Sequence, residues 1–340
     1  MAVTGKKGVL LVNLGTPDAP SYRAVGKYLK QFLMDRRVID INPIARNLLV
    51  KGIIVPFRSY GSSKLYKQLW TKDGSPLKIY GYQLQKSVQE ALGNDYVVEL
   101  AMRYQSPSIE SALQKLKEAK VTEILVFPLF PQYSSACVGS VHDEVMRLMR
   151  KDWNIPVVKF IGAYYDHPSF IDAFEARGRQ YDISKYDHII FSYHGIPERH
   201  IQKSDDFNHC KFGECCDCVT SENQYCYRAH CFATTRALVE RFQLKEENYT
   251  SCFQSRLGKD PWLQPYTSDI VEKLAKEGKK NVLVFCPAFV ADCLETTIEI
   301  GVEYMEEFEE FGGEHLQLVE GLNAHPLWAS AVKDIILEYV

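Results

Sequence analysis

Two short segments of this chain carry side chains that can bind a metal ion or move protons. His194 lies in one of them, residues 192–197 (SYHGIP), and Glu295 lies in the other, residues 292–296 (DCLET). Each segment follows an apolar run typical of a buried parallel strand, and open α/β sheets bind ligands just beyond the carboxyl ends of their strands. We therefore expect an imidazole and a carboxylate at the same edge of one sheet, where they can ligate a metal, transfer protons, or both.

Further glutamates follow Glu295 at intervals of four residues, namely Glu299, Glu303 and Glu307. Residues four apart share one face of a helix, and such a row of carboxylates costs roughly a few tenths of a kcal/mol per exposed pair. A solvated acidic face explains the glutamates from Glu306 onward. Glu295 and Glu299 lie close to the strand end, so we interpret them as the start of a track that passes protons or hydrated cations along the helix.

Six of the ten cysteines are concentrated in one polar segment: Cys210, Cys215, Cys216, Cys218, Cys226 and Cys231. The segment has little apolar material to fold around, so a bound metal would supply its order. Zinc takes four tetrahedral ligands, for which His209 and His230 are further candidates, and an iron–sulfur cluster takes four thiolates. The spacing alone does not choose between these two sites, and disulfide or adventitious use is the remaining alternative.

Apolar runs recur along the chain and alternate with segments of helical periodicity. We expect eight strands, at residues 9–14, 97–102, 124–130, 157–161, 188–193, 249–253, 282–286 and 316–320. Residues 109–116 and 270–274 place apolar side chains three or four apart, as an amphipathic helix requires. Strands that alternate with helices predict parallel sheets with helices on both faces.

The two halves of the chain have a similar layout. Residues 122–130 (TEILVFPLF) and 281–289 (NVLVFCPAF) both contain an apolar strand that ends at a proline. We predict an α/β fold of two similar Rossmann-like domains, each with a four-stranded parallel sheet flanked by helices. Their expected bounds are residues 1–165 and 166–325, with a cleft between them and a final helix at 326–340 that packs on the first domain.

Composition narrows the classes of function. The chain has 340 residues, of which 46% are hydrophobic and 24% charged, and a net charge of −3, which does not favour a nucleic-acid partner. No apolar run approaches the roughly 18 residues of a membrane span, and the first apolar run is too short for a signal peptide, so we expect a cytoplasmic protein. The residues after the first strand lack the G-x-G-x-x-G and G-K-[ST] patterns, which argues against a nucleotide cofactor.

Taken together, the motifs resemble those of the ferrochelatases, which insert Fe(II) into a porphyrin in haem synthesis. The resemblance runs through nearly the whole chain. It includes residues 11–17 (LVNLGTP), 74–77 (GSPL), 102–104 (MRY), 130–134 (FPQYS), 192–197, 253–258 (FQSRLG), 262–267 (WLQPYT) and 292–296. It implies two α/β domains that hold protoporphyrin IX between them and insert ferrous iron to give protohaem, with release of two protons.

The resemblance also assigns roles to residues. It implies that His194 and Glu295 bind the metal, with Glu299 and Glu303 continuing an acidic helix that is often widened to a π-type turn. We expect His194 to accept pyrrole protons or to hand over the metal. The porphyrin-contacting positions are Arg58, Tyr66 and Ser75 on the lip and Tyr133 deeper. The lip itself falls on residues 48–57. This run also fits an ordinary buried helix, but Gly52 and Pro56 favour a lip rich in loops. The lip offers a surface for peripheral membrane contact, and protein partners are not readable.

Some ferrochelatases carry a [2Fe–2S] cluster, in certain bacterial members within an internal segment like residues 203–231. This favours a cluster over zinc. The expected ligands are Cys210, Cys215, Cys218 and Cys226, with Cys216 and Cys231 in reserve. One departure is Cys293, which stands where some relatives have His. Two alternative functions remain, a chelatase for coproporphyrin or another tetrapyrrole, and a non-catalytic haem or iron–sulfur sensor.

Overall fold

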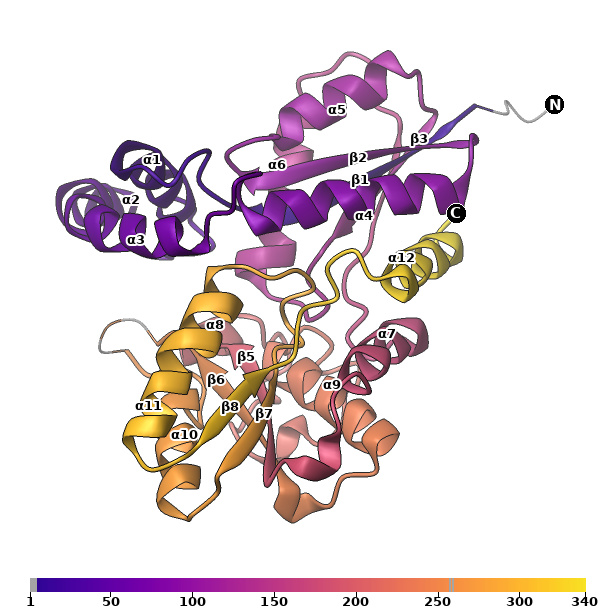
Figure 1. Ribbon diagram of the computed structural model, residues 1–340. Coiled ribbons are helices and arrows are strands. Elements are labelled where there is room, and N and C mark those ends of the chain that lie inside the picture. Colours follow the sequence, from indigo (N-terminus) through magenta and orange to yellow (C-terminus); the bar gives the residue numbers. More distant parts are fainter. Residues whose placement is uncertain (1–4, 257, 259) are drawn as a thin grey trace. The chain divides into compact units, whose positions relative to one another are not determined.

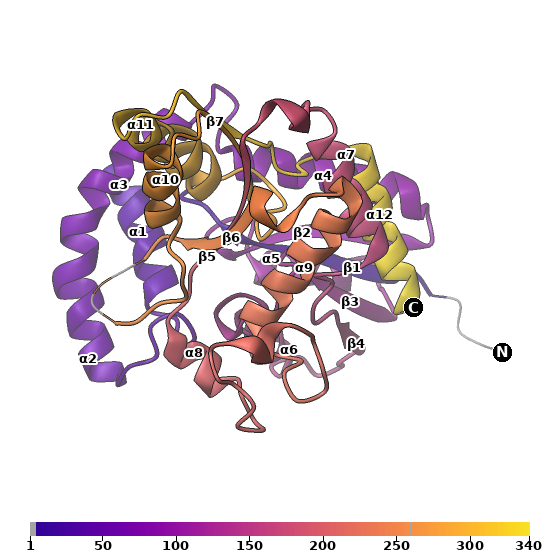
Figure 2. The same ribbon diagram turned by 90° about the horizontal axis from the view of Figure 1, so that it is seen from below.

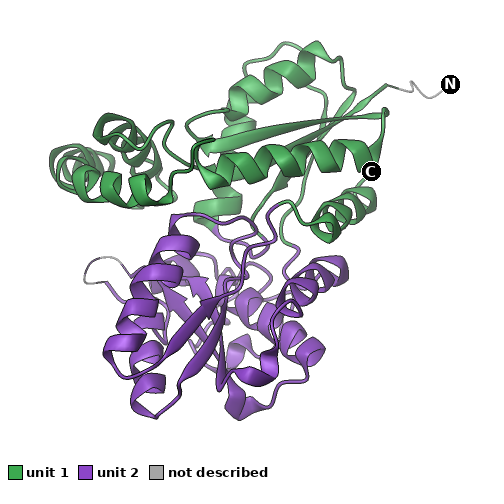
Figure 3. Cartoon of the chain, viewed as in Figure 1, with its two compact units in different colours: residues 1–130, 135–163, 324–340 green, residues 131–134, 164–323 purple. Residues whose placement is uncertain are grey.

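The computed structural model describes residues 5–256, 258 and 260–340. Leu257 of the FQSRLG motif and the first four residues of the expected N-terminal domain lie outside the described residues. The chain divides into two compact units (Figure 3). Unit 1 comprises Met1–Phe130, Ser135–Ala163 and Ala324–Val340, and unit 2 comprises Pro131–Ser134 and Tyr164–Asn323.

Unit 1 contains four strands, several α-helices and two π-helical segments (Figure 1). In chain order they are β1 (Lys7–Gly15), α1 (Tyr22–Leu33), α2 (Pro43–Asn47), η1 (π, Leu48–Ile54), α3 (Val55–Leu69), α4 (Pro76–Leu92), β2 (Tyr96–Tyr104), α5 (Ile109–Glu118), β3 (Glu123–Pro128), η2 (π, Ser135–Gly139), α6 (Ser140–Met149), β4 (Val157–Phe160) and α12 (Pro326–Glu338).

The sheet of unit 1 is parallel, in the order β2-β1-β3-β4. Its central strand β1 is fully buried over residues 9–12 (VLLV), as expected of a parallel strand covered on both faces. Helices α5 and α6 pack on one face against Leu10 and Val12. Helix α4 packs on the opposite face and contacts α12. Gly81 of α4 permits this approach, because a Cβ there would lie 2.9 Å from the Leu100 side chain of β2.

Unit 2 contains four more strands. In chain order its elements are α7 (Pro168–Gly178), η3 (3-10, Ile183–Lys185), β5 (His188–His194), α8 (Glu198–Lys203), η4 (3-10, Glu214–Cys216), α9 (Tyr227–Phe242), η5 (3-10, Glu246–Asn248), β6 (Tyr249–Gln254), α10 (Thr267–Lys276), β7 (Asn281–Phe285), η6 (π, Leu294–Tyr304), α11 (Met305–Glu310) and β8 (His315–Leu318).

The sheet of unit 2 repeats the strand order of unit 1, as β6-β5-β7-β8, and is again parallel. Helices lie on both faces of this sheet (Figures 1 and 2), and alternate strand residues face opposite layers. Ile190 and Val284 pack with α10 and η6, whereas Phe191 and Phe285 lie on the face of α9. The chain leaves β5 toward β6 on one side and returns to β7 on the other. The point between β5 and β7 is therefore the topological switch at which such sheets bind ligands.

The predicted fold class is confirmed. All eight expected strands are present, and the expected helices at 109–116 and 270–274 are α5 and α10. The expected final helix is α12, which ends at Glu338. Strand ends shift by one or two residues; β3, for example, ends at Pro128.

Candidate functional site

His194 is the last residue of β5, at the switch point of the unit 2 sheet. Its Nδ1 lies 2.6 Å from the backbone oxygen of Gly195. A carbonyl oxygen only accepts hydrogen bonds, so Nδ1 carries the proton and donates it. In the neutral ring Nε2 then holds the free lone pair, which can take a proton or a metal ion. The rings of Trp262 and Phe289 flank the imidazole, with centroids 6.5 and 6.2 Å away.

Glu295 and Glu299 lie on η6, a π-helix that follows β7. Its first turn is fixed by a reciprocal cap in which the backbone N–H of Cys293 donates to Thr296 Oγ1 at 3.0 Å. A π-helix bonds residue i to i+5 and so has a wider turn than an α-helix. This winding brings Tyr304 to Glu299, five residues earlier, and the two side chains share a hydrogen bond. The π-type winding implied by the resemblance is thus present.

The Glu299 carboxylate is held by the residues that end β6. Ser255 Oγ lies 2.6 and 2.9 Å from its two oxygens, and Gln254 Nε2 donates to it at 3.3 Å. Ser255 adopts a φ of 67°, a left-handed conformation that costs of order 1–3 kcal/mol outside glycine and is found at functional sites. The backbone thus turns immediately after the strand and directs the hydroxyl toward the carboxylate.

Burial raises the pKa of the Glu299 carboxyl above its ordinary value. The Ser255 hydrogen bond and the nearby His194 oppose this shift, whereas the Glu295 carboxylate adds to it. These effects require the three side chains to lie near one another. The structure therefore brings His194, Glu295 and Glu299 together at one edge of the unit 2 sheet.

Gln254 connects the elements that carry these groups. Its Oε1 accepts a hydrogen bond from Ser192 Oγ of β5 at 2.9 Å, and its Nε2 donates to the backbone oxygen of Glu295 at 2.8 Å. We did not single out Gln254, Ser255 or Tyr304 from the sequence. A signal existed for the first two, because the FQSRLG motif directly follows a predicted strand of the same sheet.

The acidic row differs in exposure along its length. Glu295, Glu299 and Glu307 are partly buried, whereas Glu303 is exposed. Partial burial and the charges of Glu303 and Glu310 raise the pKa of Glu307. The row thus leads from the strand ends of unit 2 to solvent, which fits a path for protons or cations.

Part of the cysteine-rich segment forms a cluster before α9. Cys210, Cys215 and Cys226 line one small cavity. The sulfur atoms of Cys215 and Cys216 are 4.0 Å apart, and Cys216 and Cys226 share a hydrogen bond. Cys218, by contrast, is exposed and lines no part of this cavity. Three of the four expected ligands, Cys210, Cys215 and Cys226, are therefore brought together. The reserve residue Cys216 contacts two of them, whereas the expected ligand Cys218 is exposed.

The thiols of this cluster influence one another. The Cys216 hydrogen bond lowers the pKa of Cys226, and backbone N–H groups at the start of α9 act in the same direction. Burial raises the pKa of Cys210, with Cys215 and Cys216 adding to the shift. A thiolate at a helix N-terminus is favoured as a metal ligand. The reserve residue Cys231 is fully buried within α9.

No group of three or more His, Cys, Asp or Glu side chains among the described residues is arranged to hold a metal ion. The cysteine cluster nevertheless fits a thiolate-bound group in its chemistry, since four thiols interact directly or through a shared neighbour. His209 lines the same small cavity as Cys210, Cys215 and Cys226, with its Nδ1 3.1 Å from Glu222, and stays a candidate zinc ligand. His230 Nδ1 instead accepts a backbone hydrogen bond from Tyr133.

The expected lip differs from the prediction. Residues 48–57 form no loop; they belong to η1 and the start of α3, which continue from α2 without a break. Gly52 lies within the π-helix, and Pro56 is the second residue of α3, directly after the winding changes from π to α. Leu48, Ile53 and Phe57 are nonetheless exposed, so the surface is apolar. No helix in the described part of the chain is both long and apolar enough to cross a membrane.

The remaining substrate positions differ in exposure. Arg58 is exposed on α3, whereas Tyr66 on the same helix is buried. Ser75 is the N-cap residue of α4 and is also buried, with its hydroxyl 2.9 Å from Thr16 Oγ1. Tyr133 is partly buried in unit 2. Tyr66 and Ser75 are therefore buried, and their role as porphyrin contacts on the lip stays a prediction.

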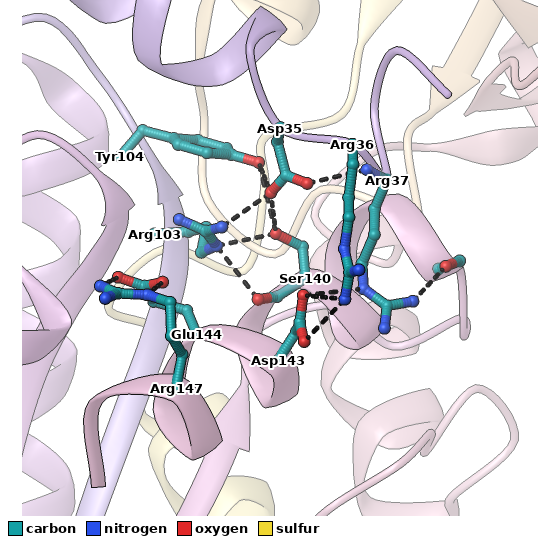
Figure 4. A network of polar contacts seen from close by, with 10 residues as sticks. Asp35, Arg36, Arg37, Arg103, Tyr104, Ser140, Asp143, Glu144 and Arg147 are labelled. Atoms are coloured by element: carbon teal, nitrogen blue, oxygen red, sulfur yellow. Dashed lines mark hydrogen bonds and ion pairs between the residues drawn. The ribbon is translucent and has the colours of Figure 1, made fainter. Parts of the chain in front are cut away.

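Unit 1 contains a buried polar network around Asp35 (Figure 4). Its Oδ2 accepts hydrogen bonds from Arg103 at 2.7 Å, Tyr104 at 2.9 Å and Ser140 at 2.6 Å. Arg103 also donates to Ser140 Oγ at 2.7 Å. The network explains the MRY motif structurally, because it ties the end of β2 to the loop after α1 and the start of α6.

Comparisons with known proteins bear on this chain as a whole. The ferrochelatase family model matches residues 6–340. A ferrochelatase of Legionella pneumophila (strain Corby) is 45% identical over 335 residues, which cover 98% of this chain and 100% of the relative. One of Coxiella burnetii (strain RSA 493 / Nine Mile phase I) is 42% identical over 334 residues, covering 96% and 92%.

The solved structures that match support the fold alone, because their sequence identity is low. SirB from Bacillus subtilis with Fe3+ has a TM-score of 0.54 at 12% identity, and the match covers 98% of this chain and 95% of that chain. The sirohydrochlorin chelatase SirB from Bacillus subtilis subspecies spizizenii in complex with cobalt has a TM-score of 0.56 at 11% identity, with 98% and 94% covered.

We predict that Asp35→Ala lowers the free energy of unfolding by about 3–5 kcal/mol, because it leaves the buried Arg103 charge unpaired. The side chains of Asp35 and Arg103 are only 6% and 13% exposed. Asp143→Ala is the matched control; it breaks pairs with Arg36 and Arg37, which are 67% and 31% exposed, while Asp143 itself is 35% exposed, and it should cost about 0–1 kcal/mol. Urea unfolding measures both, and equal losses would contradict the prediction.

We also predict that Glu299→Gln changes how stability depends on pH. The pKa of Glu299 in the folded state is raised above its unfolded value of 4.5, so ionising this carboxyl destabilises the folded protein. This loss of stability is absent below pH 4.5 and is complete above the folded-state pKa. The variant should therefore gain melting temperature relative to the parent at pH 8, and the gain should shrink toward pH 4. Thermal unfolding followed across this range measures it; a gain that grows toward low pH would show that the sign is wrong.

Proposed function

The chain belongs to the ferrochelatase family of metal chelatases, and we propose that it inserts Fe(II) into protoporphyrin IX to give protohaem. The observation that carries this proposal is the convergence of His194 with Glu295 and Glu299 at the switch point of the unit 2 sheet. An imidazole and two carboxyl groups suit a reaction in which a dication replaces two protons. Iron and porphyrin are substrates here, and haem is the product.

In the proposed mechanism His194 accepts the pyrrole protons or binds Fe(II) and hands it over. Because Nδ1 donates to Gly195, the basic atom is Nε2. Fe(II) enters the ring only as the two N–H protons leave, so a positioned base lowers the barrier to insertion. A site that binds a bent macrocycle better than a flat one exposes the nitrogen lone pairs and adds catalysis by differential binding.

Glu295 and the acidic row handle the ions. We assign Glu295 to bind Fe(II) or to act opposite it, since it lies in the first turn of η6 and both it and His194 lie near Glu299. Glu299 has a raised pKa, which suits a carboxyl that takes up and releases protons. Glu303 is exposed and would pass these protons, or incoming cations, to and from solvent.

The porphyrin contacts are proposed from the resemblance, with Arg58, Tyr66 and Ser75 in unit 1 and Tyr133 in unit 2. The exposed apolar side chains of η1 and α3 support a further role for the lip. An exposed apolar surface of this kind suits the binding of a hydrophobic porphyrin and peripheral contact with a bilayer. Cytoplasmic localisation and the choice of protoporphyrin over coproporphyrin remain predictions from the sequence.

For the cysteine-rich segment we propose a [2Fe–2S] cluster held by Cys210, Cys215 and Cys226, with a fourth thiolate. The contacts of Cys216 with Cys215 and Cys226 support it as the fourth ligand in preference to the exposed Cys218. A bound cluster would supply order to the segment and one-electron chemistry. Zinc is the alternative occupant.

Anaerobic incubation with Fe(II) and protoporphyrin IX tests the main proposal through the absorbance change from porphyrin to haem. We expect the parent protein to form haem and His194→Ala to lose about 10²- to 10⁴-fold in rate, the usual contribution of a general base. The control His315→Ala alters an exposed histidine of the same unit and should leave the rate unchanged. Normal turnover by His194→Ala would rule out the role given to this residue, and turnover with coproporphyrin alone would move the protein to that substrate.

The cluster assignment is tested by visible absorbance and by iron and acid-labile sulfide content after anaerobic purification. We expect the parent protein and Cys218→Ser to contain the cluster and Cys216→Ser to lose it. The reverse pattern would return the fourth ligand to Cys218. Zinc without sulfide in the parent protein would replace the cluster with a zinc site.

A further inference from the structure

One face of α9 reaches two residues of the proposed site. Tyr227, His230 and Thr234 are spaced by three and four residues, so they lie on the same side of the helix. All three are buried. Each bonds the backbone or a side chain of a segment far away in the sequence, and two of these segments carry His194 and Tyr133.

His230 holds the backbone of Tyr133. The Tyr133 N–H donates to His230 Nδ1 at 3.1 Å, and the imidazole is only 1% exposed. A buried backbone N–H needs an acceptor. Removing that acceptor destabilises the protein more than breaking an exposed hydrogen bond does, because the N–H is then buried without a partner. The next residue back is fixed by the same helix, because Gln132 Nε2 donates to Thr234 Oγ1 at 3.0 Å.

The imidazole of His230 is itself held in one orientation. Its ring stacks on Tyr165, with centroids 4.0 Å apart and planes 17° from parallel. Thr234 Oγ1 donates to the backbone oxygen of Tyr165 at 2.7 Å, which keeps that ring in place. The acceptor for Tyr133 is thus a rigid group whose direction is set by packing.

Tyr227 makes the equivalent contact with His194. Its hydroxyl donates to the His194 backbone oxygen at 2.9 Å, where β5 ends. Tyr227 begins α9 immediately after Cys226, and the ring of Tyr225 lies 5.0 Å from the ring of Tyr133. The last residues of the cysteine-rich segment therefore lie directly against the groups that hold the site.

We propose that Tyr227 and His230 are positioning residues, Tyr227 for His194 and His230 for Tyr133, so that α9 sets the geometry of both. Neither touches the reacting atoms. The inference rests on the proposed function, since it takes Tyr133 as a porphyrin contact and His194 as the base. The cysteine-rich segment is also connected to the site, because Tyr227, which directly follows Cys226, bonds the His194 backbone.

Steady-state haem formation separates the two roles. His230→Phe keeps a ring that can stack on Tyr165 and removes the acceptor; we expect the porphyrin KM to rise about 3- to 10-fold with kcat nearly unchanged. Tyr227→Phe removes only a hydroxyl; we expect kcat to fall by a similar factor with the porphyrin KM unchanged. Tyr181→Phe is the matched control, because this hydroxyl also bonds a backbone carbonyl of unit 2, at Leu318; both constants should stay at parental values.

Rescue distinguishes the hydrogen bond from mere packing. In His230→Asn the side-chain oxygen stands the same number of bonds from Cβ as Nδ1, so it can accept from Tyr133; we expect its KM to return to within about 2-fold of the parent. Should His230→Phe fail to fold, Thr234→Val takes its place, since it removes the acceptor for Gln132 at nearly constant shape and should raise the KM in the same way.

Parental KM in a folded His230→Phe or Thr234→Val variant would overturn the role of α9 in holding Tyr133. If His230→Phe and Tyr227→Phe each raised the KM and lowered kcat by equal factors, the effect would be a general structural one and the proposal would be overturned as well. The same holds if His230→Asn did not restore the KM. The proposed function fails separately, if the parent protein forms no haem. In that case absorbance titration of the same variants with protoporphyrin IX still tests the positioning of Tyr133.

Discussion

The hydrogen bonds of one buried amide, that of Gln254, keep the proposed site together. The side chain accepts from Ser192 on β5 and donates to the Glu295 backbone and the Glu299 carboxylate on η6. The strand that presents His194 and the π-helix that presents the glutamates are therefore fixed to the end of β6. If one of these hydrogen bonds is broken, a polar group is left buried without a partner, so the arrangement is stable only when all of them are formed. The chemistry of the site depends on this fixed spacing.

Much of the fold was predictable because parallel strands that are buried on both faces have unbroken apolar sequences. The segment 189–191 (IIF) and its counterpart 282–285 (VLVF) are examples, and both are fully or almost fully buried. Their carboxyl ends meet at one edge by topology, so the pairing of His194 with Glu295 could be anticipated. Gly52 and Pro56 misled, since the helical winding continues through both: Gly52 lies within η1, and Pro56 follows at the junction of η1 with α3.

Other parts of the site were beyond sequence reasoning because they depend on side-chain contacts across the sheet. Nothing in local spacing distinguishes Cys216 from Cys218; only the fold shows the first buried against Cys226 and the second exposed. The same holds for His230, which was a candidate zinc ligand by residue type. In the structure it accepts a backbone hydrogen bond and stacks on Tyr165, and both its neighbours and its burial assign it to the support of Tyr133.

The central claim is that a divalent metal meets His194 through Nε2 beside the carboxylates of η6. Crystals soaked without air in Co(II), a less easily oxidised stand-in for Fe(II), test it directly by anomalous scattering. The account predicts a peak within bonding distance of His194 Nε2 and on the side of Glu295, with Nδ1 still donating to Gly195. A peak bonded to Nδ1, or metal bound only by the cysteine-rich segment, would contradict it.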